Sequence, residues 1–261
     1  REMGVKPEIV TGHDFRSYSA AVKVALTSGL MAAGCKVHDI GLAITPMAYF
    51  AQFALDAPSV AMVTASHNEN GWTGVKMGCQ RPLTFGPDEM GQLRDIVLGG
   101  DFDLVGGGTY EAVPDFRARY IDDLTDGISI GRKLKVVAAC GNGTAGAFAP
   151  KVLEGIGAEV IPLDTELDYN FPNYNPNPED MKMLHALRDK VLEVGADVGL
   201  GFDGDDIEFC RHITTEAGGT AVPVSAFYHG AAPKSFIRFC FAKQDAILDE
   251  AVAKLAAYFG S

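Results

Sequence analysis

Short apolar runs alternate with amphipathic stretches along the first half of the chain. Strand-like runs occupy residues 7–11, 36–40 and 59–63. Between them, the spacing of apolar residues predicts helices from Ser17 or Ser19 to about Ala33 and from residue 45 to about 55. Strands that alternate with helices through short connections predict a parallel sheet.

A second run of the same kind begins near residue 134. An apolar strand is expected over 134–140 and a further buried strand over 196–202, and helices are expected over 87–97, 115–126, 147–156 and 179–194. The pattern therefore predicts an α/β protein with two consecutive domains, residues 1–127 and 128–205, each built on a parallel sheet. Residues 206–261 are expected to form a small α+β unit with the order α-β-β-α.

Composition narrows the possible partners. At 261 residues, the chain is long enough for one or two domains with sizeable cores. Its net charge of −12 and its pI near 4.9 argue against nucleic acid and anionic membrane surfaces as partners. No apolar run approaches the roughly 18 residues that span a bilayer, and the first residues do not resemble a signal peptide.

The five cysteines are scattered and lack C-x-x-C spacing, which makes a disulfide framework or a zinc site unexpected. These features favour a reducing, cytoplasmic location. The sequence leaves the oligomeric state open.

Candidate chemistry gathers directly after the strand at 59–63, in the segment T-A-S-H-N at 64–68. Ligands of open α/β sheets bind in the crevice beyond the carboxyl ends of the strands, so Ser66 is placed for chemistry. Its neighbours Thr64, His67, Asn68 and Lys76 supply hydrogen-bond donors and one positive charge, which a phosphoryl group on Ser66 would need. The alternative is a polar loop with an ordinary serine.

A pair of carboxylates closes the last predicted strand, where Asp203-Gly204-Asp205 follows the apolar residues 196–202. In an extended segment, residues i and i+2 point the same way, so both carboxylates can converge on one hard cation such as Mg²⁺. An isolated D-x-D is more often a solvated turn. Its combination with T-A-S-H-N is more specific.

Together these two motifs resemble the α-D-phosphohexomutase family of phosphomannomutase/phosphoglucomutase type, whose loops read T-A-S-H-N and D-G-D-G-D-R. The resemblance covers about residues 5–205 and has further matches in the family's order at 12–16, 45–46, 74–76, 141–146 and 176–179. It implies two consecutive α/β domains of the phosphohexomutase type, with mixed, largely parallel sheets. It also implies an isomerase of carbohydrate metabolism that moves phosphate between the 1- and 6-positions of a hexose through a phosphoserine and a bisphosphate intermediate.

The resemblance assigns roles to individual residues. Ser66 would carry the phosphate and Lys76 would act at the sugar hydroxyl, while His67 supports catalysis. Mg²⁺ would be held by Ser66, Asp203 and Asp205, and the substrate, a phosphorylated hexose, would be contacted by Thr64, Asn68 and Arg16. Arg16 could instead pair with Asp14 across the turn that follows the first strand.

The sequence departs from the family pattern after Asp205. The next residues are Asp206 and Ile207, so the third aspartate is out of register and the arginine is absent. The metal site would lack one protein ligand unless Asp206 or water substitutes. The family's third and fourth domains are also missing, from which we expect turnover far below that of a complete mutase.

The glycine-rich segment at 141–146 could cradle a phosphate, because small residues let backbone N–H groups approach an anion. Tight packing between helix and strand explains the same composition, and we favour it.

The tail at 206–261 resembles a different family, the C-terminal part of class I aminotransferases, in which the residue matching Arg238 binds a substrate carboxylate. Nothing upstream offers that family's Schiff-base lysine context or its phosphate site, so pyridoxal phosphate chemistry is not expected. Two alternatives to a mutase remain open from the sequence: an aminotransferase-related protein, and a non-catalytic phosphosugar-binding module in which Ser66 is never phosphorylated.

Overall fold

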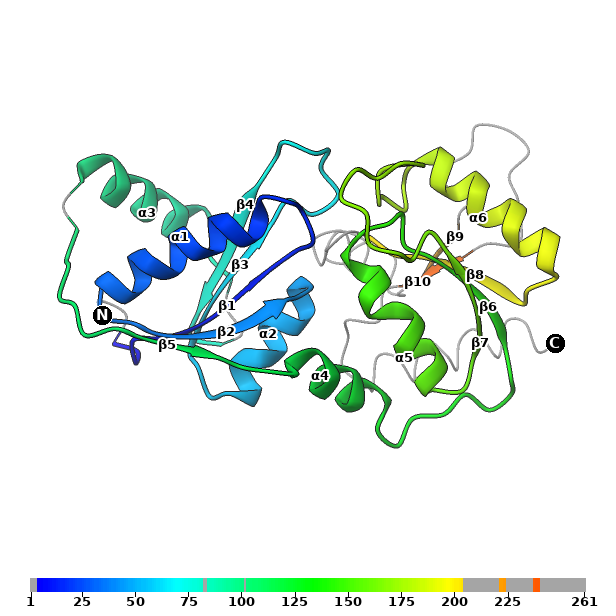
Figure 1. The fold of residues 1–261 in the computed structure, drawn as a ribbon, viewed down its shortest axis with the longest axis horizontal. Coiled ribbons are helices and arrows are strands. Elements are labelled where there is room, and N and C mark those ends of the chain that lie inside the picture. Colours follow the sequence, from blue (N-terminus) through cyan, green and yellow to red (C-terminus); the bar gives the residue numbers. More distant parts are fainter. Residues whose placement is uncertain (1–3, 82–83, 101, 204–220, 224–236, 240–261) are drawn as a thin grey trace.

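The structure is a computed structural model that describes residues 4–81, 84–100, 102–203, 221–223 and 237–239 (Figure 1). Over residues 4–203 the described chain forms two α/β units, each with its own sheet, joined through helix α4 (Phe116–Thr125). This architecture confirms the predicted fold class.

The first unit contains a five-stranded sheet in the order β4-β3-β1-β2-β5. Every neighbouring pair is parallel except β3 and β4, so the sheet is mixed and largely parallel, as expected. The short connection 65–73 accounts for the antiparallel pair, because parallel strands need a longer crossover. The strands are β1 (Glu8–His13), β2 (Lys36–Leu42), β3 (Ser59–Thr64), β4 (Gly74–Cys79) and β5 (Thr109–Ala112).

Two of these strands were not expected from the sequence. All four residues of β5 are exposed, so its segment carries no apolar signal. The segment of β4 contains two glycines and no clear alternation of apolar and polar residues.

Helices α1 (Ser19–Ala32) and α2 (Thr45–Ala54) lie on opposite sides of this sheet (Figure 1). The strand order explains their placement. The crossover from β1 to β2 runs one way along the sheet, and the crossover from β2 back to β3 runs the other way. Because such crossovers are right-handed, the two helices must cover opposite faces. Helix α3 (Pro87–Gly99) follows β4 and buries none of its residues.

The core of the first unit extends into the second. It contains aromatic side chains from α2, from α4 and from the start of the second unit. The rings of Tyr120 and Phe148 meet edge to face, with 6.4 Å between their centroids. The packing around α4 therefore ties the two units together. The buried members of this core are Val10, Ile40, Ala43, Met47, Ala48, Ala51, Ala57, Val60, Met62, Phe116, Tyr120 and Phe148.

The second unit has a three-stranded parallel sheet in the order β7-β6-β8. Its helix α6 begins after Asp180, whose carboxylate accepts a hydrogen bond from the N–H of Lys182 at 2.8 Å, and ends at Gly195 in the left-handed conformation. The helix expected over 147–156 is shorter than predicted, since a 3₁₀ turn precedes it. The elements are β6 (Lys135–Ala139), η1 (Thr144–Ala147), α5 (Ala149–Gly155), β7 (Glu159–Leu163), α6 (Met181–Val194) and β8 (Val198–Gly201).

The glycine-rich segment 141–146 packs against the loop that follows β7. A Cβ built on Gly146 would lie 1.9 Å from the carbonyl oxygen of Thr165, and one on Gly141 would lie 2.8 Å from the Cα of Pro176. The close packing that we favoured from the sequence is therefore present, but its partner is this loop rather than a neighbouring helix or strand.

Replacing Gly146 with alanine is expected to destabilise the fold, because the Cβ would meet backbone that has to move. Overpacking of this kind costs about 1–3 kcal/mol. Gly91 in α3 is the matched control, since a Cβ there meets nothing within 4 Å and alanine favours a helix interior by up to about 1 kcal/mol. Urea unfolding midpoints should fall for Gly146→Ala and hold or rise for Gly91→Ala; equal midpoints would contradict the packing.

The tail is described only at β9 (Ala221–Pro223) and β10 (Ile237–Phe239), which form an antiparallel pair. Both lie within segments where strands were expected. The helices expected in the tail, together with Asp205 and Asp206, lie outside the described residues. The likeness to aminotransferases and the role of Arg238 remain predictions.

Two features expected from composition can be checked over the described residues. There, no helix is both long enough and apolar enough to cross a membrane. Within this part, Cys79 and Cys140 are free thiols.

Candidate functional site

The site lies where the strand order of the first sheet changes direction. Strand β1 stands between β2, which follows it in the sequence, and β3, so the carboxyl ends of β1 and β3 flank a switch point. Ligands of open α/β sheets bind at such points. Asp14 and Arg16 follow β1, and Ser66 follows β3, which places all three at this switch point.

Ser66 has an unusual backbone. Its φ angle of 54° lies in the left-handed region, which costs a non-glycine residue of the order of 1–3 kcal/mol unless its surroundings hold it there. Its Oγ is buried and has no hydrogen-bond partner among the described residues. A strained, buried and unsatisfied hydroxyl at the switch point of a sheet is typical of a functional group rather than a packing residue.

Asp14 is the hub that fixes this end of β3. The carboxylate is fully buried and accepts five hydrogen bonds. Thr64 Oγ1 and the N–H of Ala65 donate to it at 3.1 and 3.2 Å, and the side chains of Ser19 and Arg16 donate as well. The pairing of Asp14 with Arg16 considered from the sequence is therefore present, as a buried ion pair.

Arg16 extends this framework to the Ser66 loop. Its guanidinium donates to the carbonyl oxygens of Ser66 and Asn68 at 2.8 and 2.7 Å. The side chain is only 3% exposed. In the structure the NH1 and NH2 groups of Arg16 are engaged by Asp14 and by the loop backbone. Its expected contact with substrate remains a prediction.

Thr64 and Asn68 are also turned toward the loop itself. Thr64 Oγ1 accepts from the N–H of Ser66 at 3.0 Å, and Asn68 Nδ2 donates to the carbonyl of Ala65 at 2.8 Å. Lys76 lies on β4, half-buried, opposite Met62 of β3. Their contacts with substrate remain predictions.

The second unit reaches this loop from the other side. His67 Nδ1 lies 3.2 Å from Asp203 Oδ2, so the end of β8 meets the residue next to Ser66. Asn175 donates to the carbonyl of His67, and the N–H of Phe15 donates to Thr144 Oγ1 at 3.0 Å. The two motifs singled out from the sequence, 136 residues apart at His67 and Asp203, therefore lie in one place.

Asn175 and Thr144 were not identified from the sequence. Asn175 lies in a proline-rich loop, where an asparagine reads as a turn residue. Thr144 lies in the glycine-rich segment 141–146, which was considered as a phosphate cradle and as a site of close packing but not as a contact of the first unit. No local pattern signals a contact with a loop that lies about a hundred residues away in the chain, which is why sequence reasoning missed both.

The residues that could hold a divalent cation are Ser66 and Asp203. A hydroxyl without a hydrogen-bond partner among the described residues, and a carboxylate that contacts the next residue, His67, are hard oxygen ligands of the kind that Mg²⁺ prefers. Over the described residues, no group of three or more His, Cys, Asp or Glu side chains is arranged for metal binding. Asp205, the other expected ligand, lies outside them.

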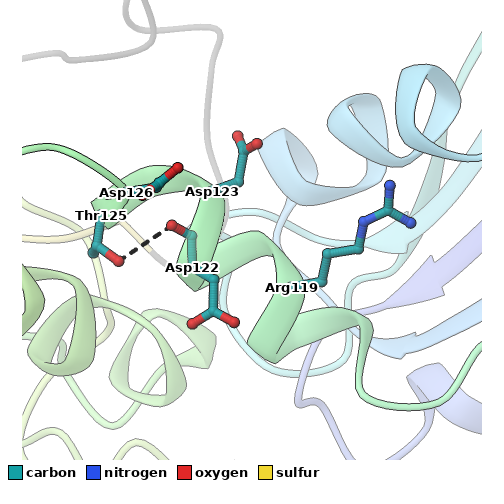
Figure 2. Close-up of a pocket in the computed structure, with 5 residues that line it drawn as sticks. All are labelled: Arg119, Asp122, Asp123, Thr125 and Asp126. Atoms are coloured by element: carbon teal, nitrogen blue, oxygen red, sulfur yellow. Dashed lines mark hydrogen bonds between the residues drawn. The ribbon is translucent and has the colours of Figure 1, made fainter.

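A surface pocket on α4 is a poor alternative for an anionic substrate. It is lined by Arg119, Asp122, Asp123, Thr125 and Asp126, and Figure 2 shows Thr125 donating to the carbonyl of Asp122. Three carboxylates against one guanidinium would repel phosphate.

The pH dependence of stability should report on His13, which ends β1. Burial lowers the pKa of His13 below 6.5, and the charge of Lys23 lowers it further, although its hydrogen bond to the backbone of Asp14 opposes the shift. The unfolded chain then takes up this proton at a higher pH than the folded chain, so stability is lost as pH falls below about 6.5, down to the folded pKa.

Urea midpoints measured between about pH 7.5 and 5.5 should therefore fall more for the wild type than for His13→Gln. The comparison isolates His13 from the other titrating groups, which both proteins share. Parallel pH profiles would refute the link to His13.

Comparisons with known proteins identify the family of the chain. Residues 1–103 match the family model described as phosphoglucomutase/phosphomannomutase, alpha/beta/alpha domain I, and residues 118–206 match that of domain II. Over these two segments the chain belongs to the phosphoglucomutase/phosphomannomutase family.

Individual relatives carry mutase names. A phosphomannomutase/phosphoglucomutase of Pseudomonas putida is 38% identical over 200 residues, which are 77% of this chain and 42% of that protein. A probable phosphoglucosamine mutase of Methanobrevibacter smithii is 30% identical over 224 residues, which are 85% of this chain and 49% of that one. The chain thus spans less than half the length of these relatives.

Solved structures show the same fold. The crystal structure of a phosphoglucomutase/phosphomannomutase family protein from Burkholderia thailandensis aligns with a TM-score of 0.72 and 25% identity, covering 97% of this chain and 62% of that one. A putative phosphomannomutase from Thermus thermophilus aligns with a TM-score of 0.60 and 27% identity, covering 74% and 44%.

Proposed function

We propose that this chain is the phosphoserine-bearing half of a phosphohexomutase. The observation that carries the proposal is the Ser66 hydroxyl, which is buried, without a hydrogen-bond partner among the described residues, and held at φ 54° beside the contact between His67 and Asp203. Family membership over domains I and II and the names of the relatives support it.

In the proposed reaction, phospho-Ser66 transfers its phosphoryl group to a free hydroxyl of a hexose monophosphate. A bond forms between phosphorus and the sugar oxygen while the bond to Ser66 Oγ breaks, which gives a hexose bisphosphate. The sugar turns over and its other phosphate returns to Ser66, so the product is the isomeric monophosphate and the serine is phosphorylated again. Such a transfer depends mainly on positioning and charge neutralisation.

The roles follow from this chemistry. Lys76 polarises the sugar hydroxyl or relays its proton, and Arg16 holds the backbone of Ser66 in place. Ser66, Asp203 and Asp205 would hold Mg²⁺, which neutralises charge on the transferring phosphoryl group when bound.

Transfer of radiolabelled phosphate from a hexose 1,6-bisphosphate to the chain tests the proposal. Protein-bound label approaching one phosphoryl group per chain is the expected result. A chain that binds the bisphosphate but takes up no label is a phosphosugar-binding module instead, and the proposal fails.

A further inference from the structure

We infer that Asn175 is a positioning residue through which the second unit sets the backbone geometry of the loop 65–73, which contains Ser66. The inference rests on the proposed function of Ser66. It concerns a side chain from the loop 164–178, far in sequence from the residues expected to form the site.

Each backbone carbonyl of residues 65–68 accepts a hydrogen bond. The carbonyl of Ala65 accepts from the N–H and the side chain of Asn68 at 3.0 and 2.8 Å, and those of Ser66 and Asn68 accept from Arg16. All of these donors come from the first unit. The carbonyl of His67 is the exception, because its donor is the side-chain amide of Asn175 in the second unit.

This hydrogen bond acts on a strained segment. Ser66 stays at φ 54° only while its surroundings hold it there. The carbonyl of His67 lies one peptide unit from Ser66, so releasing it lets the loop relax and moves Oγ. A misplacement of about 1 Å can cost about 100-fold in rate when a reaction depends on positioning.

The neighbours of Asn175 in the chain hold its backbone in place. It lies between Tyr174 and Pro176, which are both buried, and the hydroxyl of Tyr174 donates to Asp164. Burial and then the neighbouring Asp164 raise the pKa of Tyr174, so its phenol stays protonated and keeps donating. The backbone of Asp164 in turn accepts from the N–H of Asn142 at 2.6 Å.

The same loop touches the first unit at further points. The ring of Tyr169 lies 6.4 Å from that of Phe15, the guanidinium of Arg16 lies 5.6 Å from the centre of the Phe171 ring, and Asn70 donates to the carbonyl of Tyr169. These contacts pack the loop 164–178 against the first unit. In addition to them, Asn175 of the same loop bonds to the carbonyl of His67, the residue next to Ser66.

The test compares Asn175→Ala with Asn175→Gln and Asn170→Ala. Glutamine keeps the amide donor, and Asn170 is an exposed asparagine of the same loop whose side chain bonds only to Asp168 among the described residues. For Asn175→Ala we expect the maximal rate of labelling by hexose 1,6-bisphosphate to fall at least about tenfold. The half-saturating concentration should change little, since the substrate contacts remain. Asn175→Gln should recover part of the rate, and Asn170→Ala should match the wild type.

Amide hydrogen exchange of a peptide that covers residues 64–72 gives a second readout that needs no activity. Exchange should speed up in Asn175→Ala and stay at the wild-type rate in Asn170→Ala. If the wild type takes up no label, the proposed function fails while the exchange comparison still decides the role of Asn175. Wild-type exchange in Asn175→Ala would overturn the inference, as would equal loss of labelling in all three variants.

Discussion

Replacing Ser66 with alanine is expected to abolish transfer of a phosphoryl group from a hexose bisphosphate to the chain. The proposed reaction needs a covalent bond to Oγ, and alanine has no atom that can form it. Because Ser66 Oγ has no hydrogen-bond partner among the described residues, removing it breaks no such contact with them and should leave the free energy of unfolding almost unchanged. Loss of labelling with intact stability separates a chemical role from a structural one.

Ser28→Ala is the control for this experiment. Ser28 is an exposed serine of α1 whose hydroxyl donates to the carbonyl of Val24 at 3.0 Å, far from any proposed chemistry. It should label like the wild type. Label that persists in Ser66→Ala would show that another residue accepts the phosphate.

Replacing Asp14 with alanine should have the largest effect on stability. The carboxylate has no exposed surface, accepts five hydrogen bonds and pairs with the buried guanidinium of Arg16. Removing one partner leaves the other charge buried without compensation, which typically costs about 3–5 kcal/mol. The end of β3 would be released as well, since Thr64 and Ala65 both donate to Asp14.

Urea unfolding of three further variants separates these contributions. Asp189→Ala removes an exposed carboxylate paired with Arg188, and the midpoint should hardly move. Arg16→Met combined with Asp14→Ala should cost less than the sum of the two single changes, since neither charge is then left alone. Additive losses in this cycle would show that the ion pair is not the source of the effect.

The sequence was informative wherever a local pattern determines local structure. Apolar periodicity identified β1, β2, β3, β6 and β8 and most helices to within a few residues, because buried faces must repeat with the period of the element. The same reasoning placed Ser66 and Asp203 at strand ends. It missed β4 and β5, which have little or no buried face.

The framework around Ser66 could not be predicted in the same way. The bonds from Arg16 to the carbonyls of Ser66 and Asn68 were not predicted, because they depend on the reversal of strand order at β1, which brings the two loops together. The contact of Asn175 with His67 depends on how the second unit seats against the first. Such contacts follow from tertiary packing, which no spacing of residues along the chain encodes.

The most direct test of the central claim is the mass of the protein and of its Ser66 peptide after exposure to hexose 1,6-bisphosphate and Mg²⁺. The account predicts a mass increase of one phosphoryl group, carried by the peptide that contains Ser66 and removed by treatment with a hexose monophosphate, which takes the group up. An unchanged mass, or a phosphoryl group found on any other peptide, would contradict it.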